Sequence, residues 1–245
     1  MGKRLLVVNP LGTDLYDLQT LELLAPVVSS STDLVVRSLG DGVPKTAYLP
    51  ITSLFYNQLI QVIVDAQREG FDAAAIACCS DPALPECKDV VSIPVTAPME
   101  AACHTAPAHG WLTVIAPRIP SGEGENLPQD SNWVRQLVRR YGMLDNLANV
   151  RVARAGHPSP SVTASLLEED PDQLRQMVRE QMAESIAGPG LDQARLAYSE
   201  DEARSVFFAC TLWGGLLDPV RDEVPVAVLD PLVTMVKFAE LLAWS

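Results

Sequence analysis

Residues 72–80 read DAAAIACCS, and residues 202–211 read EARSVFFACT. Each stretch is an apolar run of strand length that ends in cysteine, Cys78 in the first and Cys210 in the second. Short apolar runs of this kind are typical of buried strands in a parallel sheet. The two stretches therefore predict two equivalent strands, each with a thiol at the point where the strand gives way to the following turn.

The sequence around the two cysteines repeats as well. One unit opens with LLVVNP at residues 5–10, and the other opens with LTVIAP at residues 112–117. After each cysteine, at a nearly equal distance, a proline stands between aliphatic residues, Pro94 in the first unit and Pro225 in the second. A shared α/β pattern would explain the strands alone. A thiol at the matching place in both units favours an ancestral duplication.

Short β-branched runs alternate with helical patterns almost throughout the chain. This alternation predicts an α/β fold whose parallel sheets are covered by helices on both faces. The expected strands are Arg4–Asn9, Asp33–Ser38, Asp72–Cys78, Pro94–Ala97, Trp111–Ala116, Asn149–Ala155, Arg204–Cys210 and Val226–Asp230. The clearest expected helices are Ser53–Glu69, Ser131–Tyr141, Pro171–Ile186 and Leu232–Trp244.

The repeat predicts two pseudo-symmetric Rossmann-like (flavodoxin-like) domains. We expect the first to comprise residues 1–98 and 226–245, completed by the C-terminal helix, and the second to comprise residues 99–225. Sheets of this type bind ligands outside the carboxyl ends of their strands. Two such domains facing each other would place Cys78 and Cys210 on opposite sides of one cleft, where we expect the active site.

Composition narrows the class of protein. A net charge of −13 opposes binding to nucleic acid or to an anionic membrane. No apolar stretch approaches the length of a membrane span, and the N-terminus lacks the pattern of a signal peptide. An odd number of cysteines without a secretory signal predicts reduced thiols in the cytoplasm. Neither C-x-x-C nor H-x-x-x-H occurs, so we expect no metal site, and we expect Cys87 and Cys103 to be inert buried side chains.

The positions of the repeated cysteines suggest proton transfer. A thiol at a strand end, near the start of the next helix, is placed for a lowered pKa, and its thiolate would then act as a base near neutral pH. The thiolate of Cys78 or Cys210 would remove a proton from a carbon next to a carbonyl, and the opposite thiol would return one to the other face. The resulting enolate needs hydrogen-bond donors, and Ser80 and Thr211 are the candidates. Asn9 is a candidate to hold a carboxylate or amide of the substrate.

Several motifs carry a resemblance to the Asp/Glu racemase superfamily, and within it to the hydantoin/allantoin racemase branch. VVNPLGTD at residues 7–14 is similar to a strand followed by N-P-N-T/S. Residues 70–84, GFDAAAIACCSDPAL, resemble G-x-D-A-x-x-x-A-C-F-x-D-P/T-G-L. IPVTAPMEAACHTA at residues 93–106 resembles P-V-x-G-x-x-E-A-A. Residues 207–242 resemble the branch's second catalytic segment and its C-terminal helix, which ends in V-K-x-A-E.

The resemblance implies a racemase that needs neither metal nor pyridoxal phosphate and acts on a small molecule, with Cys78 and Cys210 as its paired acid and base. It also implies a homo-oligomer, because relatives often form dimers or larger assemblies. The chain departs from the branch at Leu11, which replaces the second Asn of N-P-N-T, and at Ala116, where hydantoin racemases tend to carry Thr. Cys79 and Ser80 replace the usual Phe and acidic or small residue. These changes bear on the substrate more than on the chemistry.

Other residues have two interpretations each. Asn9 and Thr13 are candidate ligands, but Asn before Pro also suits the end of a strand. Thr52 lies where relatives carry a turn near the site, and the plain alternative for its segment is a helix cap. Glu100 and Asp230 could orient a thiol or cap the helix that follows them.

The same scaffold leaves alternatives to racemisation open. Decarboxylation and cis–trans isomerisation are both reactions that thiols of this superfamily carry out. A non-catalytic homologue that only binds a small ligand is the third alternative, and the residues at positions 11 and 116 lend it weight.

Overall fold

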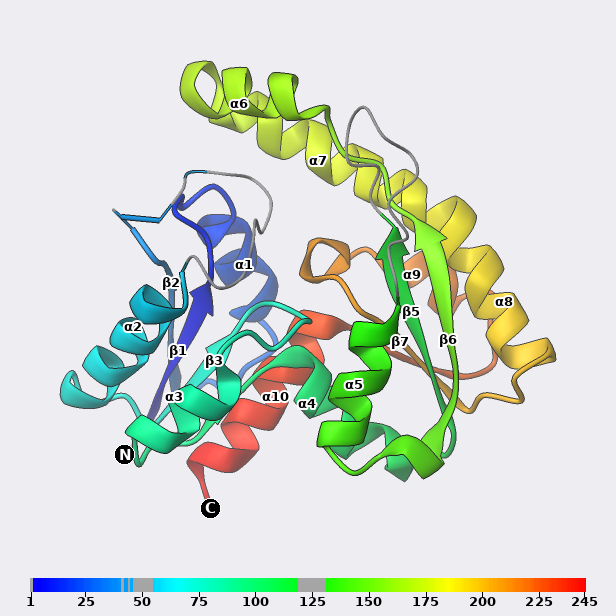
Figure 1. Ribbon diagram of the computed structural model, residues 1–245, viewed down its shortest axis with the longest axis horizontal. Coiled ribbons are helices and arrows are strands. Elements are labelled where there is room, and N and C mark those ends of the chain that lie inside the picture. The colour runs from blue at the N-terminus through cyan, green and yellow to red at the C-terminus, as the bar shows by residue number, and fades with distance from the viewer. Residues whose placement is uncertain (1, 41, 44, 46–54, 119–130) are drawn as a thin grey trace. The chain divides into compact units, whose positions relative to one another are not determined.

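The computed structural model describes residues 2–40, 42, 43, 45, 55–118 and 131–245. The chain forms two compact units, Met1–Ala101 with Leu232–Ser245, and Ala102–Pro231. Each unit holds one four-stranded sheet whose strands all run parallel (Figure 1). Within the described residues, no helix combines the length and the apolar character that a membrane crossing requires. The predicted α/β class with parallel sheets is confirmed.

The first unit contains the sheet β2-β1-β3-β4 and five helices that the structure describes. Its elements are β1 (Lys3–Asn9), α1 (Asp17–Leu24), β2 (Thr32–Ser38), α2 (Tyr56–Arg68), β3 (Ala73–Ile76), α3 (Leu84–Val90), β4 (Val95–Thr96), α4 (Pro98–Thr105) and, from the far end of the chain, α10 (Pro231–Ala243). The boundary between the two units falls inside α4 and again at the start of α10.

Alternate residues of β1 enter different layers of the first core, as the two-residue period of a strand requires. Leu5 and Val7 pack in one cluster with Leu24 of α1 and Met235 of α10. Leu6, between them, is also fully buried. In Figure 1, α2 and α10 lie on opposite sides of β1, so both faces of this sheet are covered.

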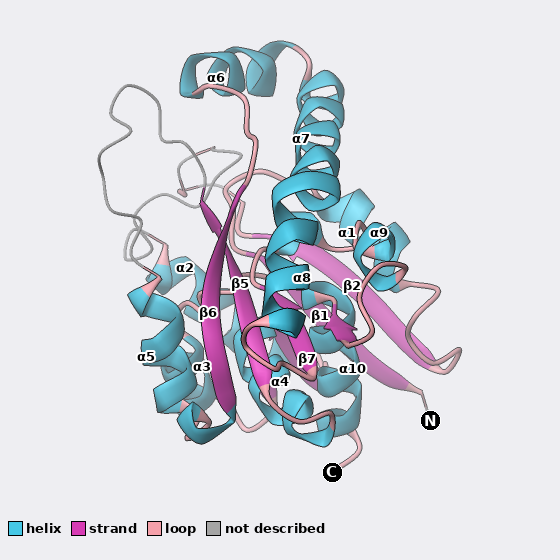
Figure 2. Cartoon of the chain, turned by 90° about the vertical axis from the view of Figure 1, so that its right-hand side faces the viewer, coloured by secondary structure: helices cyan, strands magenta, loops and turns pink. Residues whose placement is uncertain are grey.

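The second unit contains the sheet β6-β5-β7-β8. Its strands and helices are β5 (Leu112–Arg118), α5 (Asn132–Arg140), β6 (Leu147–Arg154), α6 (Pro160–Glu169), α7 (Pro171–Ser185), α8 (Leu191–Ser199), β7 (Ser205–Phe208), α9 (Asp218–Arg221) and β8 (Ala227–Leu229). Short turns of tighter or wider helix lie at Ala106–Ala108, Leu144–Asn146, Ile186–Gly190 and Thr211–Trp213. Figure 2 shows α5 and α8 on opposite sides of β5 and β6.

The helices of the second unit begin where local chemistry favours a start. Pro160 and Pro171 occupy the first positions of α6 and α7, where a missing backbone N–H costs nothing. The side chains of Ser159 and Asp170 cap these two helices by accepting backbone N–H groups of the first turn. The expected helix start at Pro171 is confirmed.

The internal repeat is confirmed at the level of topology. Both sheets have the strand order second, first, third, fourth, so that β5 to β8 repeat β1 to β4. The register repeats too, because Val8 pairs with Ile76 in the first sheet and Ile115 pairs with Phe208 in the second. Each cysteine of the repeat follows two residues after the second member of these pairs.

One part of the predicted domain division differs from the structure. Residues 226–231 were predicted to belong to the first domain, whereas β8 pairs with β7 and the second unit runs to Pro231. The physical reason is that Val228 lies beside Val206 and supplies the fourth strand that the second sheet needs. The chain therefore returns to the first unit only at Leu232, inside α10.

Candidate active site

Cys78 lies in a tight turn at the carboxyl end of β3. The backbone N–H of Ala77 donates to the carbonyl of Val8 at 2.8 Å, which is the last hydrogen bond to β1. The N–H of Cys78 then turns back to the carbonyl of Ile76 at 2.8 Å, and the carbonyl of Cys78 accepts the N–H of Asp81 at 3.0 Å. The strand ends before the cysteine because these bonds take the chain out of the sheet.

Cys210 lies in the same turn at the carboxyl end of β7. The N–H of Ala209 donates to the carbonyl of Ile115 at 2.9 Å, and the N–H of Cys210 donates to the carbonyl of Phe208 at 2.9 Å. The carbonyl of Cys210 accepts the N–H of Trp213 at 3.0 Å. The two cysteines thus share position, register and backbone hydrogen bonding within their own units.

Exposure separates these two cysteines from the other three. Cys78 and Cys210 are partly exposed, whereas Cys79, Cys87 and Cys103 are buried. Burial raises the pKa of Cys87 to about 12, and the charge of Glu86 adds to this shift. The thiols that can meet a substrate are therefore the two that the repeat singles out.

Ser80 is the first predicted binding residue that the structure brings to a cysteine. Its Oγ lies 3.2 Å from the Sγ of Cys78. Desolvation by burial raises the pKa of the Cys78 thiol; the hydrogen bonds from Ser80 oppose this rise, and the negative charge of Asp81 adds to it. The expectation of a lowered pKa at Cys78 is therefore wrong, because desolvation outweighs what the turn and the hydroxyl contribute.

Thr211, the predicted donor of the second unit, is partly exposed and directly follows Cys210. It opens the short turn Thr211–Trp213, whose last residue is fully buried. The Trp213 ring packs edge-on against Phe208, with 5.7 Å between centroids. Among the described residues the Trp213 Nε1 has no hydrogen-bond partner. Trp213 thus anchors the Cys210 turn in the core through apolar packing against Phe208.

The remaining predicted binding residues belong to the first unit. Asn9 is buried at the end of β1, and its Nδ2 donates to the Oδ1 of Asp17 at 2.6 Å. Thr13 is partly exposed in the following turn, where its Oγ1 accepts the N–H of Leu15 at 3.3 Å. Thr52 lies outside the described residues.

Asp81 is a residue of this region that the sequence reasoning did not single out. It is buried, and its two carboxylate oxygens accept the backbone N–H groups of Met99 at 3.0 Å and Glu100 at 2.8 Å, at the start of α4. It thereby ties the turn after Cys78 to the helix that follows β4. The signal in the sequence was its place three residues after the cysteine, in the Cys-x-x-Asp part of the resemblance.

Glu100 and Asp230 each hold neighbouring segments together, and neither of the contacts described here caps the helix that follows it. Glu100 is buried, accepts the hydroxyl of Thr96 at 2.9 Å and pairs with Lys88. Asp230, just before α10, accepts the N–H of Gly215 at 2.7 Å. This bond ties the segment after Cys210 to the start of α10, so a buried aspartate anchors the cysteine segment in each unit.

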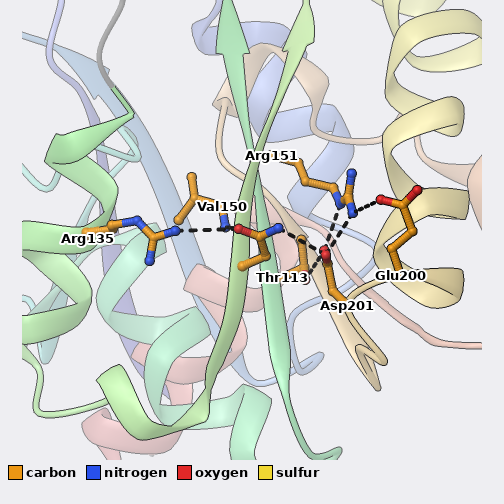
Figure 3. A network of polar contacts seen from close by, with 7 residues as sticks. Thr113, Arg135, Val150, Arg151, Glu200 and Asp201 are labelled. Carbon is orange, nitrogen blue, oxygen red and sulfur yellow. Dashed lines mark hydrogen bonds and ion pairs between the residues drawn. The ribbon is translucent and has the colours of Figure 1, made fainter.

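A second polar network of the second unit lies at the other end of β7 from Cys210. The carboxylate of Asp201 accepts hydrogen bonds from Thr113 at 3.0 Å, from Asn149 at 3.0 Å and from Arg151 at 2.7 Å (Figure 3). Asp201 precedes β7, whereas Cys210 follows it. This network joins β5 and β6 to the segment that leads into β7, and it is a structural brace.

Among the residues that the structure describes, no three His, Cys, Asp or Glu side chains gather as metal ligands do.

Comparisons with known proteins agree on one family. Residues 5–239 match the family described as Asp/Glu/hydantoin racemase. The chain is 27% identical over 242 residues to a hydantoin racemase of Pseudomonas sp. (strain NS671). The matched region covers 96% of this chain and 84% of the relative. It is 25% identical over 245 residues to a hydantoin racemase of Paenarthrobacter aurescens, with coverage of 98% and 90%. An allantoin racemase structure from Klebsiella pneumoniae shares the fold, with a TM-score of 0.74 at 21% identity over 99% of this chain and 88% of that one.

Proposed function

The chain belongs to the Asp/Glu/hydantoin racemase family, and from this premise we propose that it is a cofactor-independent racemase or epimerase. Its acid–base pair is Cys78 and Cys210, and its substrate is a small carbonyl compound with an acidic α-proton, such as a hydantoin, a ureide or an amino acid. The observation that carries the proposal is that these two cysteines alone among the five are partly exposed, in identical turns of a repeated unit.

The proposed reaction is a two-step proton exchange. One cysteine thiolate takes the α-proton, and the electron pair left on carbon moves onto the neighbouring carbonyl oxygen to form an enolate. The enolate carbon then takes a proton from the other cysteine thiol on the opposite face, which inverts the centre. Each turnover exchanges the protonation states of the two sulfurs and consumes no other reactant.

The raised pKa of Cys78 favours this residue as the proton donor at the start of the reaction. A thiol whose pKa lies above its usual range stays protonated at neutral pH, so Cys78 starts as the acid. Ser80 lies 3.2 Å from its sulfur and stabilises the thiolate that forms when the proton leaves. Thr211 and the backbone N–H groups of the two turns would stabilise the enolate oxygen.

The remaining parts of the proposal concern ligands and context. Asn9, Thr13 and Thr52 would bind the substrate from the first unit, and the two units would enclose it in the cleft that the repeat predicts. We place the protein in the cytoplasm as a homo-oligomer that acts on a small molecule and has no nucleic-acid or membrane partner. The net charge of −13 supports the last part of this assignment.

Solvent deuterium incorporation at the α-carbon tests the proposal. NMR would follow a panel of benzylhydantoin, allantoin, phenylalanine and phenylmalonate in D2O. We expect exchange with inversion for at least one compound, and loss of racemisation in both Cys78→Ser and Cys210→Ser. Cys87→Ser, at a buried thiol outside the proposed pair, is the matched control and should keep the activity.

Two outcomes would overturn the scheme. Full turnover by either single Cys→Ser variant would rule out the two-base mechanism. Release of CO2 from phenylmalonate, without exchange in any other compound, would assign the cysteines to decarboxylation.

A further inference from the structure

Three side chains are joined at the carboxyl edge of the first sheet. Asn9 and Ser38 are the last residues of β1 and β2 and lie side by side in the register of the sheet. Asp17, in the first turn of α1, reaches both of them with one oxygen. Its Oδ1 accepts the Asn9 Nδ2 at 2.6 Å and the Ser38 Oγ at 2.7 Å.

This arrangement determines which way the Asn9 amide faces. An ionised carboxylate only accepts hydrogen bonds, so the amide must present its N–H, and not its oxygen, to Asp17. The Ser38 hydroxyl donates to the same oxygen and keeps the carboxylate in place. The Oδ1 of Asn9 therefore faces away from Asp17, and a flip of the amide would set oxygen against oxygen.

The Asn9 oxygen is open to a ligand. The hydrogen bond from the Asn9 amide to Asp17 is the one side-chain hydrogen bond of Asn9 within the described residues. Asn9 as a whole is only 7% exposed. The fully buried side-chain atoms without a partner are those of His157 and Trp213 among the described residues, and the Asn9 Oδ1 is not one of them. A largely buried acceptor that none of the described groups satisfies suits a donor brought by the substrate.

Among the residues that the structure describes, the matching positions of the second unit carry no such polar pair. Asn9 lies beside Ser38 in the first sheet, and the corresponding pair in the second sheet is Ala116 beside Val152. Neither side chain can donate or accept a hydrogen bond. At these matching positions, a side chain that can form hydrogen bonds is therefore found in the first unit and not in the second.

The charges at this edge point to the same class of ligand. Asp17 stands behind Asn9, and Asp81 follows Cys78 at the end of β3. Lys88, the cation nearest to Asp81 in the sequence, is paired with Glu100. A substrate carboxylate placed against Asn9 would meet an acceptor oxygen and a nearby negative charge, whereas a neutral N–H group would meet a hydrogen-bond acceptor.

We propose that Asp17 is a positioning residue that holds Asn9 as a hydrogen-bond acceptor, so that this edge of the first sheet recognises a substrate N–H group, of the kind that a cyclic or open ureide carries, and not a carboxylate. The proposal rests on the proposed function and narrows its substrate class. It selects hydantoins and ureides over free amino acids.

The test compares benzylhydantoin with its two derivatives methylated at either ring nitrogen, and with phenylalanine. Binding is measured by calorimetry and α-proton exchange by NMR, so recognition is read even where turnover is absent. In the wild-type protein we expect one of the two methylations to weaken binding at least tenfold, because it removes the donor and leaves the Asn9 oxygen unpaired. Phenylalanine should bind more weakly than benzylhydantoin.

The variants separate positioning from folding. In Asp17→Asn the new amide can donate or accept, so Asn9 can turn either way and the discrimination should fall to a few-fold, mainly through KM. Asn9→Ala should lose the discrimination independently of Asp17. Asp33→Asn, at an exposed carboxylate of β2, removes a charge of the same unit and should keep it.

The outcomes are distinguishable from those of the proposed function. Unchanged discrimination in folded Asp17→Asn and Asn9→Ala, or tighter binding of phenylalanine than of benzylhydantoin, would overturn the assignment of Asn9. Selective binding without any α-proton exchange would uphold the assignment and instead overturn the racemase.

Discussion

Arg151 holds Asp201 with two hydrogen bonds of 2.7 Å, from Nε and from Nη2, at the amino end of the second sheet (Figure 3). The repeat places an equivalent pair in the first unit, where Arg37 donates to both oxygens of Glu69 at 3.0 and 2.7 Å. The register confirms the correspondence, because Arg37 lies beside Val8 and Arg151 beside Ile115. Each pair braces the second strand of its sheet against the segment that leads into the third.

Asp201→Asn should destabilise the protein at neutral pH. Desolvation by burial works against the ionised form, but hydrogen bonds from Arg151, Asn149 and Thr113 outweigh it and lower the pKa of Asp201. Loss of the charge leaves the mostly buried Arg151 without its main partner, at a cost of about 3 kcal/mol. Urea unfolding at pH 7 measures the loss, and a variant as stable as the wild type would contradict the brace.

The pH dependence of stability checks the same residue. Because the folded pKa of Asp201 lies below its unfolded value, the stabilisation is complete above an unfolded pKa of about 4. It is lost as the pH falls further, through the folded pKa. The difference in unfolding free energy between wild type and Asp201→Asn should therefore shrink as the pH falls below the unfolded pKa of about 4 and on through the lower folded pKa. Glu69→Gln, at the exposed counterpart pair, is the control and should have the smaller effect.

Ser80→Ala should make Cys78 less reactive. The Ser80 hydrogen bond stabilises the thiolate, so its removal raises the pKa of Cys78 further and lowers the thiolate fraction at any given pH. The measurement is the pH profile of iodoacetamide labelling, read peptide by peptide by mass spectrometry. Cys87, with a pKa of about 12, serves as an internal control that stays unlabelled in the folded protein. A profile for Cys78 that moves to lower pH would contradict the role given to Ser80.

Asp81→Asn should move the same profile in the opposite direction. The negative charge of Asp81 raises the pKa of Cys78, so a neutral side chain of the same shape should lower it and speed labelling. The amide can satisfy only one of the two N–H groups at the start of α4. We therefore expect a loss of about 2 kcal/mol in unfolding free energy alongside the faster labelling. Slower labelling by the folded variant would refute the electrostatic account.

Glu202→Gly should stabilise the second unit. Glu202 is exposed and has a φ of 53°, in the left-handed region that costs a residue with a Cβ about 1 kcal/mol. Glycine relieves this strain, so the midpoint of urea unfolding should rise. Glu202→Ala keeps the Cβ and should leave it nearly unchanged. An unfolding midpoint that falls in Glu202→Gly would mean that the flexibility gained by the unfolded chain outweighs the strain.

Much of the fold could be predicted from local pattern. A strand needs only a run of suitable residues and a helix only the right period and a start signal, so β1, β3, β5 and β7 and the helix at Pro171 were visible along the chain. The ends of β3 and β7 were placed too late, because the backbone bonds that pull Cys78 and Cys210 out of the sheet leave no mark on hydropathy. The assignment of β8 to the second sheet also depended on a strand far away in the sequence.

The features of the candidate site also fall into those that the sequence predicted and those that only the folded chain shows. The sequence by itself determined the α/β class, the internal repeat and the two cysteines at matching strand ends, because each of these follows from residue type and short-range order. The tertiary structure decided the raised pKa of Cys78, the anchoring of its turn by Asp81 and the direction of the Asn9 amide. These features arise from desolvation and from hydrogen bonds to residues that are neighbours only after the strands have paired, so no pattern along the chain could contain them.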